Sequence, residues 1–170
     1  RRLLAKLEEL KQNLKEHQQA LAVLQAISQA SNEGLEPTML LERIILAAVF
    51  TGKAQGGFVA RLNRDANRLD VQAVANLPNW DAKQIDLGLD PALSAALGVS
   101  GASEITRSTS KAGYWYHIPL VRQGATVGLM SVVGKFRQLP PAAEPILATL
   151  ASFVAYNLEN NRLRSELAVA

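Results

Sequence analysis

The sequence predicts an α+β protein in which β-hairpins form a central antiparallel sheet and helices precede and follow them. The clearest hairpin covers residues 114–135, where two runs rich in β-branched and aromatic residues flank a polar turn at 122–124. A second hairpin, with strands at 58–62 and 69–74, precedes it. Residues 3–24 carry a leucine repeat with helical spacing. These observations place strands in the middle of the chain and helices at its ends.

Composition bounds the class of protein. The chain has 170 residues, of which 48% are hydrophobic, enough for one globular domain with an extension. Its net charge of +3 is small and no basic stripe is concentrated in it, which argues against nucleic acid as a partner. No apolar run is long enough for a membrane span in this segment. We therefore expect a soluble, cytoplasmic piece of a longer chain.

The first 24 residues show a repeat with alternating gaps of four and three residues, in which six of the seven positions are leucine. The positions are Leu3, Leu7, Leu10, Leu14, His17, Leu21 and Leu24. This is the heptad seam of a coiled coil, which buries its apolar edge only against a partner helix. We therefore expect residues 1–24 to form a coiled-coil helix that joins two copies in a homodimer, parallel or antiparallel. A polar seam position such as His17 usually fixes the register.

Two further helices are expected to pack on the sheet. Residues 37–50 begin with a proline and carry a wide apolar stripe, and residues 145–158 repeat apolar side chains at helical spacing. The chain becomes polar over 159–170, so this segment is expected to project as a connector helix. Asn157 and Asn161 continue the spacing of the apolar positions, and asparagines at such positions align partner helices. We expect them to contribute to dimerisation.

The globular domain is expected over residues 25–158, and its irregular part over 76–113. Within that part a short helix at 91–97 follows Asp90, which is a favourable N-cap residue. A short strand is expected at 104–107. Long irregular segments inside compact domains are usually functional or disordered.

The order of elements and the motifs of the long hairpin resemble the GAF family of sensor domains. The similarity covers roughly residues 20–160 and rests on packing motifs. These are Ile118-Pro119-Leu120, the turn glycine Gly124, Val127-Gly128-Leu129-Met130, Leu35-Glu36-Pro37 and Gly57-Phe58-Val59. The resemblance implies a GAF-like sandwich of the profilin and PAS type. Its central antiparallel sheet would carry helices on one face, with the irregular segment roofing a ligand pocket on the other.

Four side chains are candidates for ligand contact in such a pocket. If Ile118 faces the helices, the period of two in a strand puts Trp115 and His117 on the pocket side. Trp80 lies in the roof segment, and Arg107 has the guanidinium fork that pairs with anions. The alternatives remain open at this point: aromatic packing at a strand end, a lid over the core, or a solvated arginine.

The sequence gives little support to cofactor or enzyme chemistry. Cysteine is absent, which excludes a covalently attached bilin in this segment and the cysteine chemistry of sulfoxide reduction. His117 is a possible haem or metal ligand, but no second ligand lies at suitable spacing beside it, so haem and metal are not favoured. No histidine–acid pair is identifiable that could activate a hydroxyl nucleophile among Ser108, Thr109 and Ser110. We therefore interpret these three residues as part of a loop. We expect no enzyme activity.

The resemblance suggests a regulatory sensor module of a bacterial-type signalling protein, with an output domain in the same chain. A ligand-free structural or dimerisation domain and the effector-binding domain of a transcription regulator are the alternatives. A cavity below about 100 Å³ would favour the structural role, whereas roughly 300 Å³ or more is typical of ligand sites.

Overall fold

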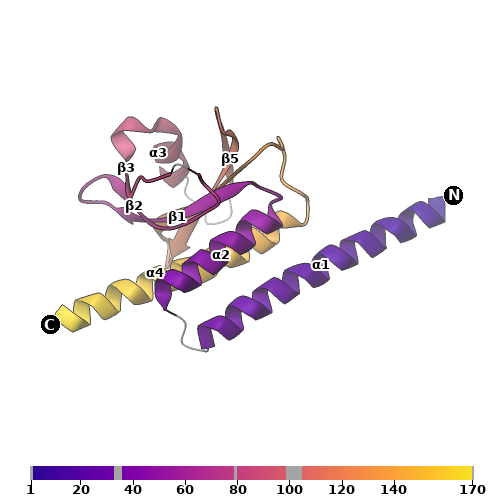
Figure 1. The fold of residues 1–170 in the computed structure, drawn as a ribbon, viewed down its shortest axis with the longest axis horizontal. Helices are drawn as coiled ribbons and strands as arrows, with labels where there is room; N and C mark the ends of the chain where they lie inside the picture. The colour runs from indigo at the N-terminus through magenta and orange to yellow at the C-terminus, as the bar shows by residue number, and fades with distance from the viewer. Residues whose placement is uncertain (1, 33–35, 79, 99–104, 170) are drawn as a thin grey trace.

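The computed structural model describes residues 2–32, 36–78, 80–98 and 105–169 (Figure 1). The helices are α1 (Arg2–Asn32), α2 (Pro37–Thr51), α3 (Pro91–Gly98) and α4 (Ala143–Val169), with a 3₁₀ turn η1 at Leu87–Leu89. The strands are β1 (Gly56–Asn63), β2 (Arg68–Ala75), β3 (Gln84–Asp86), β4 (Thr106–Ser110), β5 (Gly113–Arg122) and β6 (Ala125–Gly134). The predicted α+β class is confirmed.

The described strands form one antiparallel sheet in the order β3-β2-β1-β6-β5-β4. Both predicted hairpins are present, and the long one places β6 beside β1 at the centre of the sheet. Its turn has Gln123 at φ 53° and Gly124 at φ 79°. Left-handed conformations at both central residues suit a two-residue hairpin turn, whose twist matches that of the flanking strands. The glycine adopts this conformation without the steric cost that a Cβ would bring.

One face of the sheet is covered by α2 and α4. The apolar stripe of α2, from Leu40 to Val49, and that of α4, from Leu147 to Leu158, pack against side chains of the central strands such as Val59, Ile118 and Met130. Burial of these stripes supplies the main hydrophobic stabilisation, at roughly 25 cal/mol per Å² of apolar surface. This layer is the principal core of the molecule.

The helix α1 lies on the outer side of α2, away from the sheet (Figure 1). Its N-terminal end extends past the domain in one direction, and the C-terminal part of α4 extends in the other. A helix rises 1.5 Å per residue, so the 31 residues of α1 span about 45 Å. The two long helices therefore lead away from opposite ends of the sheet.

The opposite face of the sheet is covered by η1 and α3, and the two edge strands of the sheet differ from prediction. The strand β3 was not predicted; Gln84–Asp86 pairs with the β2 residues 68–70. A short strand was predicted at 104–107; residue 104 lies outside the described residues, and β4 runs from Thr106 to Ser110, further along the chain than predicted, and pairs with β5. Both misses have one reason: short, polar edge strands are defined by pairing with a neighbour and have little hydrophobic pattern of their own.

Candidate functional site

A cavity of about 330 Å³ lies on the face of the sheet that α2 and α4 do not cover. Its walls come from β1, β4, β5, the segment around β3, and α3. The lining residues are Phe58, Trp80, Ile85, Asp90, Ala92, Leu93, Ser108, Thr109, Ser110, Trp115 and His117. The volume lies at the lower end of the range of small-molecule sites.

Aromatic rings form one wall of this cavity. The Phe58 and Trp80 rings stack with their centroids 5.3 Å apart and an interplanar angle of 17°. Trp115 tilts against both, at 5.8 Å from Phe58 and 6.4 Å from Trp80. It also lies parallel to His117, at 6.1 Å and 7°. Rings arranged in this way present flat, polarisable surfaces that favour contact with another ring.

His117 is at the centre of a chain of hydrogen bonds across three strands. Its Nδ1 lies 2.8 Å from Ser131 Oγ on β6, and its Nε2 lies 2.8 Å from Ser108 Oγ on β4. The side chain is only 3% exposed. Burial lowers the pKa of His117 to about 4, although the nearby Asp90 carboxylate acts in the opposite direction. The imidazole is therefore neutral at pH 7, with one nitrogen donating and the other accepting.

Asp90 gives the cavity its charge. Among the described lining residues it is the one acidic side chain, and these residues include no lysine or arginine. Its Oδ1 accepts a hydrogen bond of 3.1 Å from the backbone N–H of Leu93, which confirms the predicted N-cap of α3. The cap fixes the carboxylate at the cavity wall.

The structure brings together three of the four predicted ligand-contact residues. Trp80, Trp115 and His117 all line the cavity, and Trp115 and His117 lie on the side expected from strand alternation. Arg107 does not line it. Its guanidinium donates to the carbonyl oxygen of Arg137 at 2.8 Å and lies 5.9 Å from the Tyr114 ring centroid. Because β4 continues to Ser110, alternation gives the cavity side to Ser108 and the other side to Arg107.

Sequence reasoning missed the two serines that bind His117. Ser108 was interpreted as part of a loop, and Ser131 gave no signal because it lies among apolar residues of β6. The register that brings Ser131 opposite His117 could have been inferred once the turn at 123–124 was fixed. The edge-strand partner Ser108 required the β4–β5 pairing itself.

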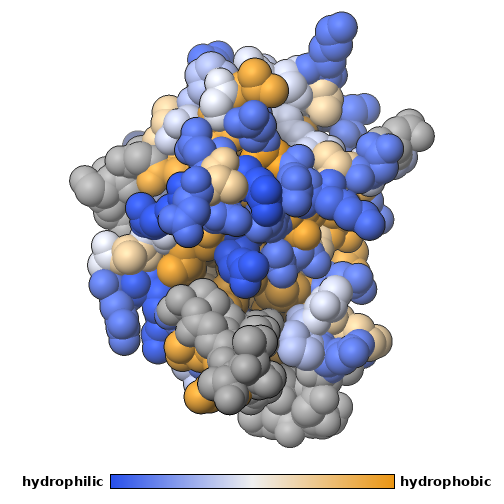
Figure 2. All heavy atoms as spheres, turned by 90° about the vertical axis from the view of Figure 1, so that its left-hand side faces the viewer, coloured by the Kyte–Doolittle hydropathy of each residue, from blue (hydrophilic) through white to orange (hydrophobic). Residues whose placement is uncertain are grey.

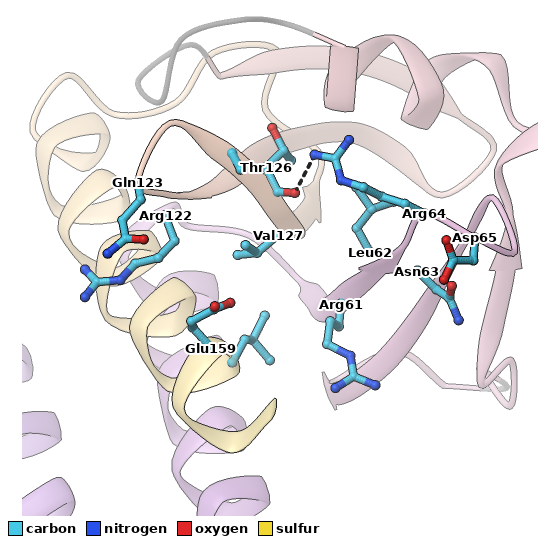
Figure 3. Close-up of a pocket in the computed structure, with 12 residues that line it drawn as sticks. Arg61, Leu62, Asn63, Arg64, Asp65, Arg122, Gln123, Thr126, Val127 and Glu159 are labelled. Carbon is cyan, nitrogen blue, oxygen red and sulfur yellow. Dashed lines mark hydrogen bonds between the residues drawn. The ribbon is translucent and has the colours of Figure 1, made fainter. Parts of the chain in front are cut away.

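A second, larger groove of about 570 Å³ lies between the β1–β2 turn, the β5–β6 turn and α4 (Figure 3). Its three arginines point in different directions. Arg64 donates to the Thr126 carbonyl oxygen at 3.0 Å, and Arg122 lies 5.1 Å from the Tyr156 ring centroid.

The end of the molecule from which α4 extends is covered mostly by hydrophilic side chains (Figure 2). The smaller cavity is the stronger candidate for a ligand site because its polar and aromatic groups converge.

The residues predicted to dimerise lie on the two long helices. The described seam leucines of α1 are exposed, from 79% at Leu3 to 51% at Leu21. The side chains of His17, Leu24 and Asn161 lie outside the described residues. The Asn157 amide donates to the Phe153 carbonyl oxygen of its own helix at 2.9 Å. These positions remain predictions for an interface.

The described part of the chain contains no helix that is both long and apolar enough to cross a membrane. Its His, Asp and Glu side chains form no group of three that could hold a metal ion.

No model of a known protein family and no curated protein matches the sequence. Solved structures do match the fold. A GAF domain of a phosphoenolpyruvate-protein phosphotransferase from Coxiella burnetii aligns with a TM-score of 0.71 and 14% identity, over 86% of this chain and 96% of that one. A GAF domain of the corresponding Acinetobacter protein aligns with a TM-score of 0.68 and 15% identity, over 84% and 94%.

A GAF domain of a putative sensor histidine kinase from Pseudomonas syringae pv. tomato also aligns, with a TM-score of 0.66 and 15% identity. That alignment covers 94% of this chain and 98% of the other. The globular part of this chain therefore has the fold of GAF domains.

Proposed function

We propose that this chain is a regulatory sensor module that binds a small organic molecule in the cavity and controls an output domain in the same protein. The observation that carries the proposal is the cavity of about 330 Å³ in which Trp80, Trp115 and His117 converge. The matching GAF domains come from a phosphotransferase and a sensor kinase, which supports a regulatory role. Fold alone does not define a ligand, so the proposal rests on the site.

The strand β5 offers a route from the cavity to the helices. Trp115 and His117 face the cavity, while Tyr116 and Ile118 face the core formed with α2 and α4. A ligand that shifts β5 therefore acts on α4, whose C-terminal part leads away from the domain. Packed helices and strands have discrete arrangements, so such a shift can favour one arrangement over another. The ligand must bind the two states with unequal affinity.

The proposed module works as a homodimer joined through α1, with help from α4. The exposed seam leucines of α1 recur with heptad spacing, and a second copy of the same helix is their natural partner. On α4, the side chains of Tyr156, Leu163 and Leu167 are also exposed, so the proposed interface includes them together with Asn157. A dimer would bring two copies of the output domain together.

The ligand proposal is tested by native mass spectrometry of gently purified protein and of the variant Trp115→Ala. We expect a bound small molecule with the parent protein and at least about tenfold less of it with the variant, because a wall of the site is removed. The control is Leu89→Ala, since Leu89 is 84% exposed and does not line the cavity. Ligand-free parent protein from its natural host would favour the structural role.

The dimer proposal is tested by the double variant Leu10→Asp, Leu14→Asp. Two carboxylates in an apolar seam cannot be buried without large cost, so we expect sedimentation to show a monomer. The control, Lys15→Asp with Ala22→Asp, places the same number of aspartates at exposed positions outside the seam. A dimer that persists in the seam variant would reject α1 as the interface.

A further inference from the structure

We propose that the cavity selects a monocationic aromatic amine: a single aromatic ring system that packs against Trp80 and Trp115 and carries a short-chain ammonium group held by Asp90. This inference rests on the proposed ligand-binding function and adds the chemical class of the ligand. It follows from the charge, the aromatic wall and the size of the site.

The charge of the cavity disfavours anionic ligands. Asp90 is the one acidic side chain among the described lining residues, which include no lysine or arginine, and the buried His117 is hydrogen-bonded to two serines. The N-terminus of α3, which Asp90 caps, carries about half an elementary positive charge, so a net negative field remains. A carboxylate or phosphate on the ligand would be repelled, whereas an ammonium would be attracted.

Asp90 also retains capacity for a ligand. A carboxylate has about four lone-pair positions, and the cap bond from Leu93 N uses one of them. The partly buried position of Asp90 weakens solvent screening of an ion pair formed there. A charge-assisted hydrogen bond at this place is stronger than one between neutral groups.

The aromatic wall suits both parts of the proposed ligand. Trp80 and Trp115 tilt against each other at 49°, so a ring can pack on one of them while an adjacent ammonium lies near the face of the other. Attraction between a cation and an aromatic face is strongest for tryptophan. The Ser108 hydroxyl, 2.8 Å from His117 Nε2, supplies a polar contact that either donates or accepts, depending on the tautomer of the imidazole.

The size of the cavity limits the ligand to a small ring system. A volume of about 330 Å³ is near the lower limit for small-molecule sites. A macrocyclic cofactor does not fit this volume. A fused bicyclic amine with a two-carbon chain does.

Three probes that share one ring test the charge directly. Tryptamine is cationic, tryptophol is its neutral alcohol analogue, and indole-3-acetate is anionic at pH 7. We expect isothermal titration calorimetry at low salt to show tryptamine binding at least about tenfold tighter than tryptophol, with indole-3-acetate weakest. Trp115→Ala should weaken all three, because the ring wall is common to them.

The matched variant is Asp90→Asn, which removes the charge and keeps a good N-cap residue for α3. We expect the preference for tryptamine over tryptophol to fall to about twofold or less, with tryptophol affinity unchanged. Equal affinity of the parent protein for tryptamine and tryptophol, or an unchanged preference in Asp90→Asn, would overturn the assignment of charge while leaving a ligand cavity in place. Failure of all three probes to bind would overturn this inference as well, whereas the proposed function itself is judged by the molecule that co-purifies.

Discussion

The two faces of the sheet are built in different ways. The face under α2 and α4 is packed with apolar side chains from both helices and four strands, including Ile44, Ile118 and Leu150, each at most 1% exposed. The other face has a smaller cluster around Phe58 and Leu129, and beside it the cavity with its buried histidine. One face stabilises the fold, and the other leaves room for a ligand.

The difference shows how one antiparallel strand can serve both purposes. In β5 the side chains alternate, so Tyr116 and Ile118 pack on the helices while Trp115 and His117 face the cavity. Hydrophobic burial on one side supplies enough stability that the other side can hold polar groups and empty volume. A close-packed interior tolerates little empty volume, which places the cavity outside the principal core.

The largest expected effect comes from removing buried leucine side chains on the two faces. Leu120 and Leu129 are both 0% exposed and lie on neighbouring strands, Leu120 in the helix-side core and Leu129 in the cavity-side cluster. We expect Leu120→Ala to lower the free energy of unfolding by about 4 kcal/mol and Leu129→Ala by about 2 to 3 kcal/mol, because the smaller cluster can relax into the cavity. Urea denaturation measures both. An equal or larger loss for Leu129→Ala would contradict the comparison.

A second effect, of intermediate size, concerns the buried histidine. The folded-state pKa of His117 is about 4, below the unfolded value of 6.5, so the unfolded chain takes up the proton first as the pH falls. The contribution of the neutral imidazole to the free energy of unfolding is therefore fully present above pH 6.5 and is lost progressively as the pH falls towards 4. The loss is on the order of 3 kcal/mol.

The measurement is the free energy of unfolding of the parent protein and of His117→Asn between pH 7 and pH 4. The variant should be less stable at pH 7 and should lose less stability over this range. Leu89→Ala, which changes an exposed side chain that does not line the cavity, is the control and should keep the parent profile. Parallel profiles for the parent protein and His117→Asn would show that the imidazole titrates normally.

The smallest expected effect concerns the N-caps of two helices that lie on opposite faces of the sheet. The short helix α3 has a side-chain cap from Asp90, whereas Glu36 makes no side-chain cap hydrogen bond at the start of α2. We expect Asp90→Ala to cost about 1 kcal/mol of unfolding free energy and Glu36→Ala less than about 0.5 kcal/mol. Thermal unfolding in low salt resolves the difference. A larger loss for Glu36→Ala would mean that α2 also depends on its first residues.

Much of the site could be predicted from local patterns, and the exceptions are instructive. Alternation in β5 was enough to place Trp115 and His117 on one side, and Asp90 was recognised as an N-cap from its position before Pro91. Arg107 was a candidate for ligand contact, with a solvated side chain as the alternative, and it does not line the cavity. Its orientation depends on β4, an edge strand whose polar residues carry no periodic signal.

Local sequence patterns predict the two hairpins, the helices that carry apolar stripes, and the polar turn at 122–124, because each depends on neighbours within a few residues. The assembled fold adds three features that these patterns do not contain: the contacts of Ser108 and Ser131 with the two nitrogens of His117, the pairing of β3 with β2, and the cavity beside the aromatic wall. These features depend on strand register and on segments distant in sequence. Their energies arise only when the whole sheet is assembled.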